Sequence, residues 1–392
     1  MSPQPPKTER LYLDQASTSF PKPRGVVEAV VHFLTENGSN PGRGSYSQSA
    51  LAAAELEETR SELAAFVGAG KPEEIVFTLN ATDSLNLAIR GLLRQGDQVV
   101  TTVLEHNSVL RPLRELERRG EIGVTHVAAS FEGEISIRSL ENALTPKTRL
   151  LVVTHGSNVL GTITPVEEIS AWAKAKGLPL LVDAAQTIGH LDLDVREMKI
   201  PLLAASGHKG LMGPQGTGFL YVEEGILLRP LRTGGTGIAS ASMDPPDHPP
   251  LRYEAGTPNT PGIFGLGAAL QFLRETSPVA VQQHEEDLTK DFLSQISRIE
   301  GIKIHGPSWG KPRLPIVAVN VEGQTPQETM FILHTQFGIE TRHGLHCAPL
   351  VHRLLNLEEH GTLRFSFGYF NTHEEIEKAA KALSLVAKTA VG

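Results

Sequence analysis

The sequence predicts an α/β fold with a mostly parallel sheet, followed by a smaller α+β region. Over the first two-thirds of the chain, short apolar runs alternate with stretches whose apolar residues recur at helical spacing. Several of the runs are apolar throughout, which is typical of strands covered by helices on both faces. We therefore expect a ligand site at the carboxyl ends of these strands.

The first elements are predicted by periodicity and by the residues at their ends. Residues 26–34 and 50–67 are helix-like, and the second stretch is closed by two glycines. Residues 74–78 read Glu-Ile-Val-Phe-Thr, a short strand. In residues 80–93 the apolar side chains again follow a helical period. The alternation continues with strands over residues 99–104, 150–154 and 178–182 and with helices over residues 109–119 and 166–176.

The pattern changes after about Gly235. Residues 240–250 contain four prolines and few apolar side chains, which indicates an exposed loop or hairpin. An amphipathic helix is predicted over residues 289–301, a half-buried strand over 316–321 and a final helix over 374–386. These elements form the expected smaller α+β region.

Composition and charge exclude several classes of protein. The chain has 392 residues, a size that suggests two to three domains, and its formal net charge of −8 disfavours a nucleic-acid binder. Its single cysteine excludes an intrachain disulfide and fits a reducing compartment. Residues 1–10 lack the apolar core of a secretory signal, and no apolar run approaches the roughly 20 residues that a membrane helix needs. We therefore expect a cytoplasmic location.

Polar clusters follow several of the predicted strands. The small and hydroxyl residues of 78–84 suit a phosphate at a helix start, or they simply cap the helix through Asn80 or Thr82. His106 is suited to stacking or proton transfer, or it is a satisfied, partly buried histidine. Asn158 binds a ligand oxygen or shapes a turn.

Two further clusters contain charged residues. Asp183 follows a buried strand, where a carboxylate pairs with a protonated ring nitrogen or caps a helix. Lys209 lies in a glycine-rich, apolar setting that favours a neutral amine able to form a Schiff base; the alternative is a surface lysine in a flexible loop. Taken together and in this order, a phosphate-suited helix start, His, Asn, Asp and Lys are what pyridoxal 5'-phosphate (PLP) requires.

The sequence resembles the class V branch of fold-type I PLP enzymes, in particular the cysteine desulfurase and selenocysteine lyase group. The resemblance runs nearly end to end. Its most specific motifs are Val182-Asp-Ala-Ala-Gln186, Ser206-Gly-His-Lys209, Glu254-Ala-Gly-Thr-Pro-Asn-Thr260 and Arg342-His-Gly-Leu-His-Cys-Ala348. It implies a large PLP-binding domain with a seven-stranded, mostly parallel sheet over residues 16–265. It also implies a small α+β domain over residues 1–15 and 266–392 that carries the cysteine loop.

The resemblance also implies roles for individual residues. Lys209 would carry the cofactor, Asp183 would pair with its pyridine nitrogen, and His106 would stack on the ring and assist proton transfer. The remaining cofactor contacts would come from Asn158 and Gln186 near the phenolic oxygen and from Ala81, Thr82, Ser206 and His208 at the phosphate. Thr257 would reach the phosphate of a partner subunit, which implies a homodimer. Arg364, with Asn158 and Arg342, would bind the substrate, and its guanidinium fork suits the carboxylate.

Cys347 is the single cysteine and falls in the motif whose cysteine accepts sulfur in this family. Its thiolate would attack the substrate sulfur and become a persulfide, with Arg342, His343 or His346 nearby to stabilise it. A lone cysteine is otherwise a small buried hydrophobe. A metal site with His343, His346 and His352 is disfavoured, because zinc sites usually show two separated ligand pairs.

The resemblance implies a PLP-dependent conversion of L-cysteine to L-alanine, with sulfur passed on for iron–sulfur clusters or other sulfur-containing cofactors. A short connection after Cys347 is typical of members that use a separate sulfur-accepting protein. Two departures, Pro41-Gly-Arg43-Gly44 and a shortened segment before Arg252, bear on the substrate and the acceptor. The alternatives are a selenocysteine lyase, a β-eliminating cystine or cysteine lyase, and a sulfur-relay partner that only shares the fold.

Overall fold

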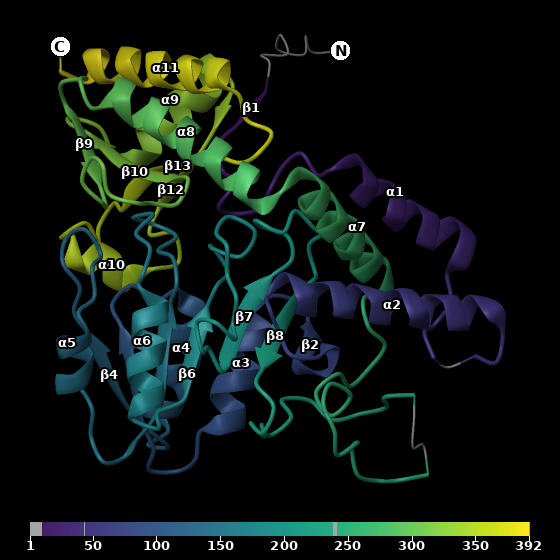
Figure 1. Cartoon of the computed structure of the whole chain (residues 1–392). Coiled ribbons are helices and arrows are strands. Elements are labelled where there is room, and N and C mark those ends of the chain that lie inside the picture. The colour runs from purple at the N-terminus through teal and green to yellow at the C-terminus, as the bar shows by residue number, and fades with distance from the viewer. Residues whose placement is uncertain (1–9, 43, 238–240, 392) are drawn as a thin grey trace.

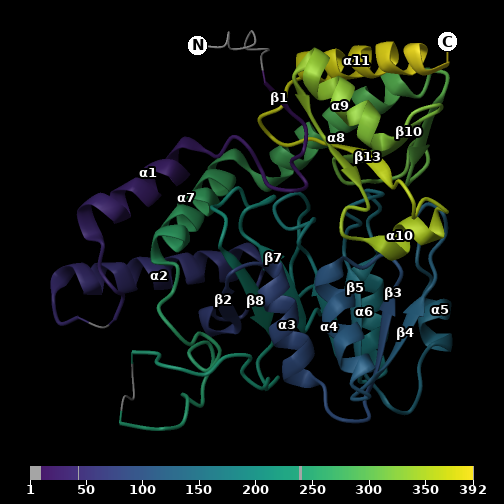
Figure 2. The same ribbon diagram turned by 180° about the vertical axis from the view of Figure 1, so that it is seen from behind.

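The computed structural model describes residues 10–42, 44–237 and 241–391. The predictions that concern residues 1–9, Arg43 and Ser240 lie outside these described residues. Figures 1 and 2 show a large sheet flanked by helices and a smaller sheet with its own helices near the carboxyl terminus. Among the helices of the described ranges, none is long and apolar enough to cross a membrane.

The large sheet is mixed but mostly parallel. In the described part of the chain, its seven strands run in the order β2-β8-β7-β6-β5-β3-β4. Their bounds are β2 Ile75–Thr78, β3 Gln98–Thr102, β4 Gly123–Val127, β5 Thr148–Thr154, β6 Leu180–Asp183, β7 Leu202–Ser206 and β8 Gly218–Val222. Only β8 runs antiparallel to its neighbours, because the loop that joins β7 to β8 contains no crossover helix. The predicted α/β fold with a mostly parallel sheet is confirmed.

Helices cover both faces of this sheet, which explains its continuous apolar strands. Along β5, Leu150 and Val152 pack with residues of α3 and α4, whereas Leu151 and Val153 pack with residues of α2, α6 and α7 on the opposite face. The α-helices of this part are α1 Arg24–His32, α2 Ser47–Phe66, α3 Ala81–Leu92, α4 Asn107–Arg118, α5 Ile137–Asn142, α6 Val166–Ala175 and α7 Thr260–Thr276. A π-turn (Phe33–Asn37) follows α1, and a 3₁₀ turn (Pro72–Glu74) precedes β2.

The smaller sheet is antiparallel and runs in the order β12-β13-β10-β9. Its strands are β9 Ile302–His305, β10 Ile316–Val321, β12 Arg342–Gly344 and β13 Thr362–Ser366, and its helices are α8 Pro278–Ile296, α9 Pro326–Phe337, α10 Pro349–Leu354 and α11 His373–Val391. The prediction of a half-buried β10 is wrong, because five of its six residues are buried. Val317 and Val319 pack into the core of the smaller part, while Ala318 on the other face joins the core of the larger part.

One further sequence prediction needs correction, and another is confirmed in one of its two alternatives. The helix expected over residues 289–301 begins earlier, at Pro278, and ends at Ile296. Proline is well suited to the first helical turn, so the segment before residue 289 belongs to the helix rather than to a loop. Residues 241–250 form a loop without a strand, which confirms the loop, and not the hairpin, for the described residues of this segment.

The amino-terminal segment lies against the carboxyl-terminal part of the chain. Strand β1 (Leu11–Tyr12) pairs in parallel with β11 (Ile339–Glu340), and Asp14 forms an isolated bridge with Ser366 of β13. Leu13 is fully buried in the core of the smaller part. This brings residues 12–18 to the space between the two sheets, although the exact division into domains stays a prediction.

Candidate active site

One polar pocket collects residues from the carboxyl ends of the parallel strands and from β12 and β13 of the smaller sheet. Most of the predicted site residues line it, although they are far apart in the sequence. They are Ala81, Thr82, His106, Asn158, Asp183, Gln186, Ser206, His208, Lys209, Arg342 and Arg364. The pocket therefore forms where the sheet topology predicts a ligand site.

Lys209 and Asp183 are a base and an acid that line the same pocket. Lys209 follows β7, and Asp183 is the last residue of β6, where it is almost fully buried. Burial lowers the pKa of Lys209 to about 8, although the Asp183 carboxylate opposes this effect. Burial raises the pKa of Asp183. The hydrogen bond that its carboxylate accepts from the Ala185 backbone N–H at 3.0 Å opposes this rise. The lysine can thus supply a neutral amine near neutral pH.

His106 precedes α4 and accepts a hydrogen bond at its Nδ1 from the backbone N–H of Ser108, at 3.1 Å. Burial, assisted by the positive charge of Lys209, lowers the pKa of His106 to about 4. The ring is therefore neutral at neutral pH, and this hydrogen bond assigns its proton to Nε2. In this tautomer the neutral imidazole can stack on a flat ring and donate a hydrogen bond from Nε2.

The start of α3 forms one wall of the pocket. Asn80 caps the helix by accepting from the Asp83 N–H at 3.1 Å, which confirms the capping interpretation for Asn80. The cap leaves the first turn facing the pocket, where the Ala81 N–H donates to Ser206 Oγ at 2.9 Å and the Thr82 and Ser108 hydroxyls lie 2.7 Å apart. Free N–H groups and hydroxyls at a helix start suit a phosphate.

Two amides of the pocket also hold neighbouring chain segments. Asn158 Nδ2 donates to the backbone oxygen of His346 at 2.6 Å, and Gln186 Nε2 donates to the oxygen of Ala16 at 3.0 Å. Both side chains are buried. Asn158 therefore connects the loop after β5 to the cysteine loop, a structural task that exists in addition to any contact with a ligand.

Arg364 is one of the most deeply buried charged residues, with a relative exposure of 1%. Its Nη1 donates to the backbone oxygen of Asn158 at 3.0 Å, and its Nη2 donates to Asp14 Oδ1 at 2.7 Å and to Ser17 Oγ at 2.9 Å. Its Nε is buried and has no hydrogen-bond partner among the described residues. A buried donor without a partner is costly, so this N–H is available to a carboxylate that enters the pocket.

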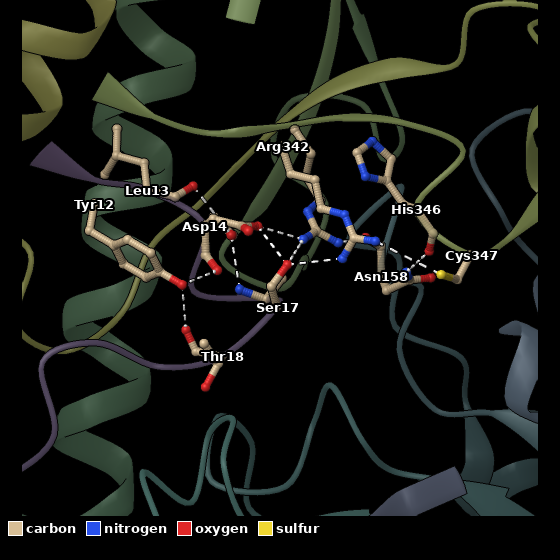
Figure 3. Close-up of polar contacts among 12 residues, drawn as sticks. Tyr12, Leu13, Asp14, Ser17, Thr18, Asn158, Arg342, His346 and Cys347 are labelled. Carbon is tan, nitrogen blue, oxygen red and sulfur yellow. Dashed lines mark hydrogen bonds and ion pairs between the residues drawn. The ribbon is translucent and has the colours of Figure 1, made fainter. Parts of the chain in front are cut away.

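Cys347 follows His346, a residue that lines this pocket, and lies between β12 and α10 in the chain. Figure 3 shows its sulfur near Asn158 and Arg342. The cysteine is half-buried, and its backbone oxygen accepts from the Asn107 N–H at 2.7 Å. Arg342 Nη2 lies 3.8 Å from its Sγ. Burial lowers the pKa of His346 well below its ordinary range, so that ring supplies no positive charge to a thiolate. Of the three neighbours named from the sequence, Arg342 is the one whose charge the structure places against the sulfur.

Thr257 is not brought together with the other predicted site residues. It is exposed and lines a separate, more apolar pocket with Asn40, whose Nδ2 lies 3.5 Å from Thr257 Oγ1. Nor do the histidines near Cys347 complete a metal site: in the described ranges, no three His, Cys, Asp or Glu side chains converge to hold a metal ion.

Three residues of the site were given no role by the sequence. Glu105 is fully buried next to the pocket, and burial raises its pKa to about 8. Asp14 and Ser17 reach Arg364 from the amino-terminal segment. They lie in the segment Tyr12-Leu-Asp-Gln-Ala-Ser-Thr18, and their contact with Arg364 depends on the tertiary fold.

The donor set fits PLP. The α3 start offers N–H and hydroxyl groups for a phosphate, Asp183 offers a buried carboxylate for a ring nitrogen, and Lys209 offers an amine of lowered pKa. His208 adds a buried Nδ1 that has no partner within the described ranges. These are the groups that a phosphorylated pyridine aldehyde requires, all within one pocket.

Comparisons with known proteins agree with this geometry. The family model described as Aminotransferase class-V matches residues 11–379. The chain is 38% identical to a protein named "Probable cysteine desulfurase" from Methanothermobacter thermautotrophicus, over 97% of this chain and 95% of that protein. It is 34% identical to a cysteine desulfurase from Yersinia pestis, over 96% and 93% of the two chains. The apo structure of a cysteine desulfurase from Thermococcus onnurineus superposes with a TM-score of 0.92 at 36% identity, covering 97% and 95% of the two chains.

Proposed function

The chain belongs to the class-V aminotransferase family, among its cysteine desulfurases, and we propose that it converts L-cysteine to L-alanine with Cys347 as the sulfur acceptor. The observation that carries this proposal is the placement of Cys347 beside the pocket that holds Lys209 and Arg364. Lys209 provides an amine, Arg364 a site for a carboxylate, and Cys347 a nucleophilic sulfur. A desulfurase needs all three.

PLP is the cofactor that this family uses, and we propose that the pocket binds it. Lys209 would hold it, Asp183 and His106 would contact its ring, and Asn158 and Gln186 would lie near its phenolic oxygen. Its phosphate would be held by Ala81, Thr82, Ser206 and His208 of this chain and by Thr257 of a partner subunit. When bound, the cofactor supplies an electron sink that stabilises negative charge on substrate carbon.

The substrate would be oriented by Arg364. Asp14 and Ser17 fix one edge of its guanidinium, and the unpartnered Nε remains for the substrate carboxylate. Because the side chain is buried and held from several sides, little conformational entropy remains to be lost on binding. The amino group of the substrate would thereby be directed toward Lys209.

Two side chains would take part in proton transfer. Lys209, with its pKa of about 8, is a suitable acceptor for the proton on the substrate α-carbon once its amine is free. His106 is neutral, with Nδ1 occupied by Ser108 and its hydrogen on Nε2, so it would assist proton transfer by donating a hydrogen bond from Nε2. Asp183 would keep a proton on the cofactor ring nitrogen, because a buried carboxylate is stabilised by a positive partner.

Sulfur transfer would take place at Cys347. Its thiolate forms an S–S bond with the substrate sulfur while the bond between that sulfur and the substrate β-carbon breaks. The electron pair of the broken bond stays on carbon, which takes up a proton and becomes the methyl group of L-alanine. One cysteine and one protein thiol thus give one alanine and one persulfide, which is then available to a separate acceptor.

Product analysis tests this function. Purified protein with PLP and L-cysteine is expected to yield alanine, and Cys347→Ala and Cys347→Ser are expected to yield none, because the sulfur then has no acceptor. Both variants should keep the yellow colour of the bound cofactor, whereas Lys209→Ala should not form the same borohydride-reducible chromophore. Pyruvate and ammonia from the wild type and from Cys347→Ala alike would instead identify a β-eliminating lyase.

Substrate choice is tested with the same protein. L-selenocysteine fits the same contacts, so the ratio of kcat/KM for the two substrates decides between a desulfurase and a selenocysteine lyase.

We propose that the enzyme acts as a homodimer, since Thr257 lies outside the pocket that holds Lys209 in the same chain. The single free thiol supports a reducing, cytoplasmic setting and delivery of sulfur for cofactor synthesis.

A further inference from the structure

One hydroxyl joins the two arginines of the site (Figure 3). Ser17 Oγ accepts hydrogen bonds from Nη2 of Arg364 at 2.9 Å and from Nη1 of Arg342 at 3.1 Å. It donates its own hydrogen to Asp14 Oδ1 at 2.8 Å. A serine hydroxyl has one hydrogen and two lone pairs, so these three contacts use its full capacity.

The two guanidinium groups differ in what else holds them. Arg364 is fixed by Asp14 and by the Asn158 backbone in addition to Ser17. Arg342 is less buried, and its Nη2 makes the 3.8 Å contact with Cys347 Sγ. Since two positive groups repel each other, a shared acceptor between them favours their close approach. Ser17 thus keeps Arg342 next to Arg364, and in this position Arg342 also lies next to the sulfur of Cys347.

We propose that Ser17 is a positioning residue that holds Arg342 against Cys347 and thereby favours the reactive thiolate. A cation beside a cysteine stabilises the thiolate relative to the thiol, and the thiolate is the nucleophile. Ser17 acts through Arg342 and does not itself react. The inference rests on the proposed function only in giving Cys347 the role of nucleophile.

The alkylation rate of the cofactor-free protein tests this inference. Cys347 is the only cysteine in the chain, so iodoacetamide reports on that thiol alone. In Ser17→Ala, Arg342 loses its shared acceptor, and we expect alkylation at neutral pH to slow by about three- to tenfold. Arg342→Ala should slow it at least as much. Ser17→Thr keeps a hydroxyl and should restore most of the wild-type rate.

The pH profile of alkylation separates positioning from a general loosening of the fold. A lost cation moves the rise in rate to higher pH and changes the plateau only modestly, because every thiol is ionised there and a thiolate of higher pKa is a slightly better nucleophile. A loosened loop would raise the plateau through greater exposure. Circular dichroism and urea unfolding should confirm that each variant is folded.

Ser19→Ala is the matched control on the same segment. Ser19 Oγ contacts the His208 backbone oxygen at 3.2 Å and Lys22 Nζ at 2.7 Å. We expect wild-type alkylation for this variant. Equal rates for Ser17→Ala and wild type, equal slowing in Ser19→Ala, or a wild-type rate in Arg342→Ala would each overturn the proposal. Because alkylation needs neither cofactor nor turnover, a failure of the proposed desulfurase activity would not be mistaken for a failure of Ser17.

Discussion

At the scale of single residues, burial shifts the pKa values of acids and bases around the pocket in opposite directions. It lowers the pKa of Lys209 to about 8 and raises the pKa values of Asp183 and Glu105. The two acids also repel each other, which raises the pKa of Glu105 further. Burial therefore shifts each of these groups toward its neutral form, and a cationic ring nitrogen would favour the charged form of Asp183.

Glu105 gives a pH-dependent prediction. Its pKa is about 8 when folded and near 4.5 when unfolded, so over this window the folded chain keeps a proton that the unfolded chain has lost. The free energy of unfolding should therefore fall as pH rises from 4.5 to 8, by at most about 1.4 kcal/mol per pH unit from this group. Glu105→Gln removes this dependence and can keep the acceptor for Thr102 Oγ1 and the Thr154 N–H.

Urea unfolding of the wild type and Glu105→Gln across this pH range measures the effect. The stability of the variant relative to wild type should increase with pH, since other titrating groups cancel in the comparison. Glu141→Gln, at a half-exposed position paired with Lys176, is the control and should show little change. A constant difference for Glu105→Gln at all pH values would contradict the assigned protonation.

At the scale of elements, the start of α3 combines a stability task with a binding task. Asn80 caps the helix and so fixes its first turn, whose residues Ala81 and Thr82 line the pocket. Its side chain does not need to touch a phosphate in order to affect phosphate binding. The capping interpretation and the phosphate interpretation of residues 78–84 are therefore compatible.

Asn80→Ala should destabilise the protein by about 1 kcal/mol through loss of the cap. It should also weaken PLP binding, because the first turn of α3 frays at the pocket. Ser136→Ala at the start of α5 is the matched control, since Ser136 Oγ accepts from the Ser139 N–H at 3.1 Å away from the pocket residues. We expect a similar loss of stability there with unchanged PLP affinity. Equal PLP affinity for wild type and Asn80→Ala would contradict the binding task.

At the scale of the whole molecule, the site is assembled from two sheets and from the amino-terminal segment that lies between them. The larger sheet contributes the polar residues after its strands, and the smaller sheet contributes Arg342 and Arg364. Thr257 lines a different pocket. If it contacts the phosphate as proposed, it must do so in a second copy of the chain, so a complete site needs two copies.

Mixed dimers test this arrangement. Thr257→Ala should lower PLP affinity by about tenfold, the cost of one hydrogen bond to a charged group. Mixing it with Lys209→Ala should produce dimers with one restored site, because the Thr257→Ala subunit retains Lys209 and receives an intact Thr257 from its partner. Titration of each protein with PLP, followed by the absorbance of the bound cofactor, measures both the affinity and the fraction of restored sites. Wild-type affinity in Thr257→Ala homodimers, or no restoration in the mixture, would contradict the role of Thr257.

The sequence by itself determined the class of fold and most of the pocket. Apolar runs such as residues 150–154 predicted strands covered on both faces, and strand topology then places Asp183 and Lys209 at one edge. The strand predictions succeeded because local periodicity reflects burial directly. Several pocket residues, such as Ala81 and His208, were instead implied by the family resemblance. The sequence did not predict the start of α8 or the burial of β10. Helix α8 begins at a proline, a residue that is also typical of loops. Strand β10 is buried because the larger and the smaller part of the molecule pack against its two faces.

Only the tertiary structure decided which charges meet. Residues 14 and 364 are joined by an ion pair, and Ser17 lies between two arginines that are far along the chain. No local pattern encodes such contacts, since they depend on how the amino-terminal segment packs against β13. The same holds for protonation: the sequence identifies Lys209, Glu105 and His346 as ionisable, but the surrounding dielectric and charges set their protonation in the folded protein.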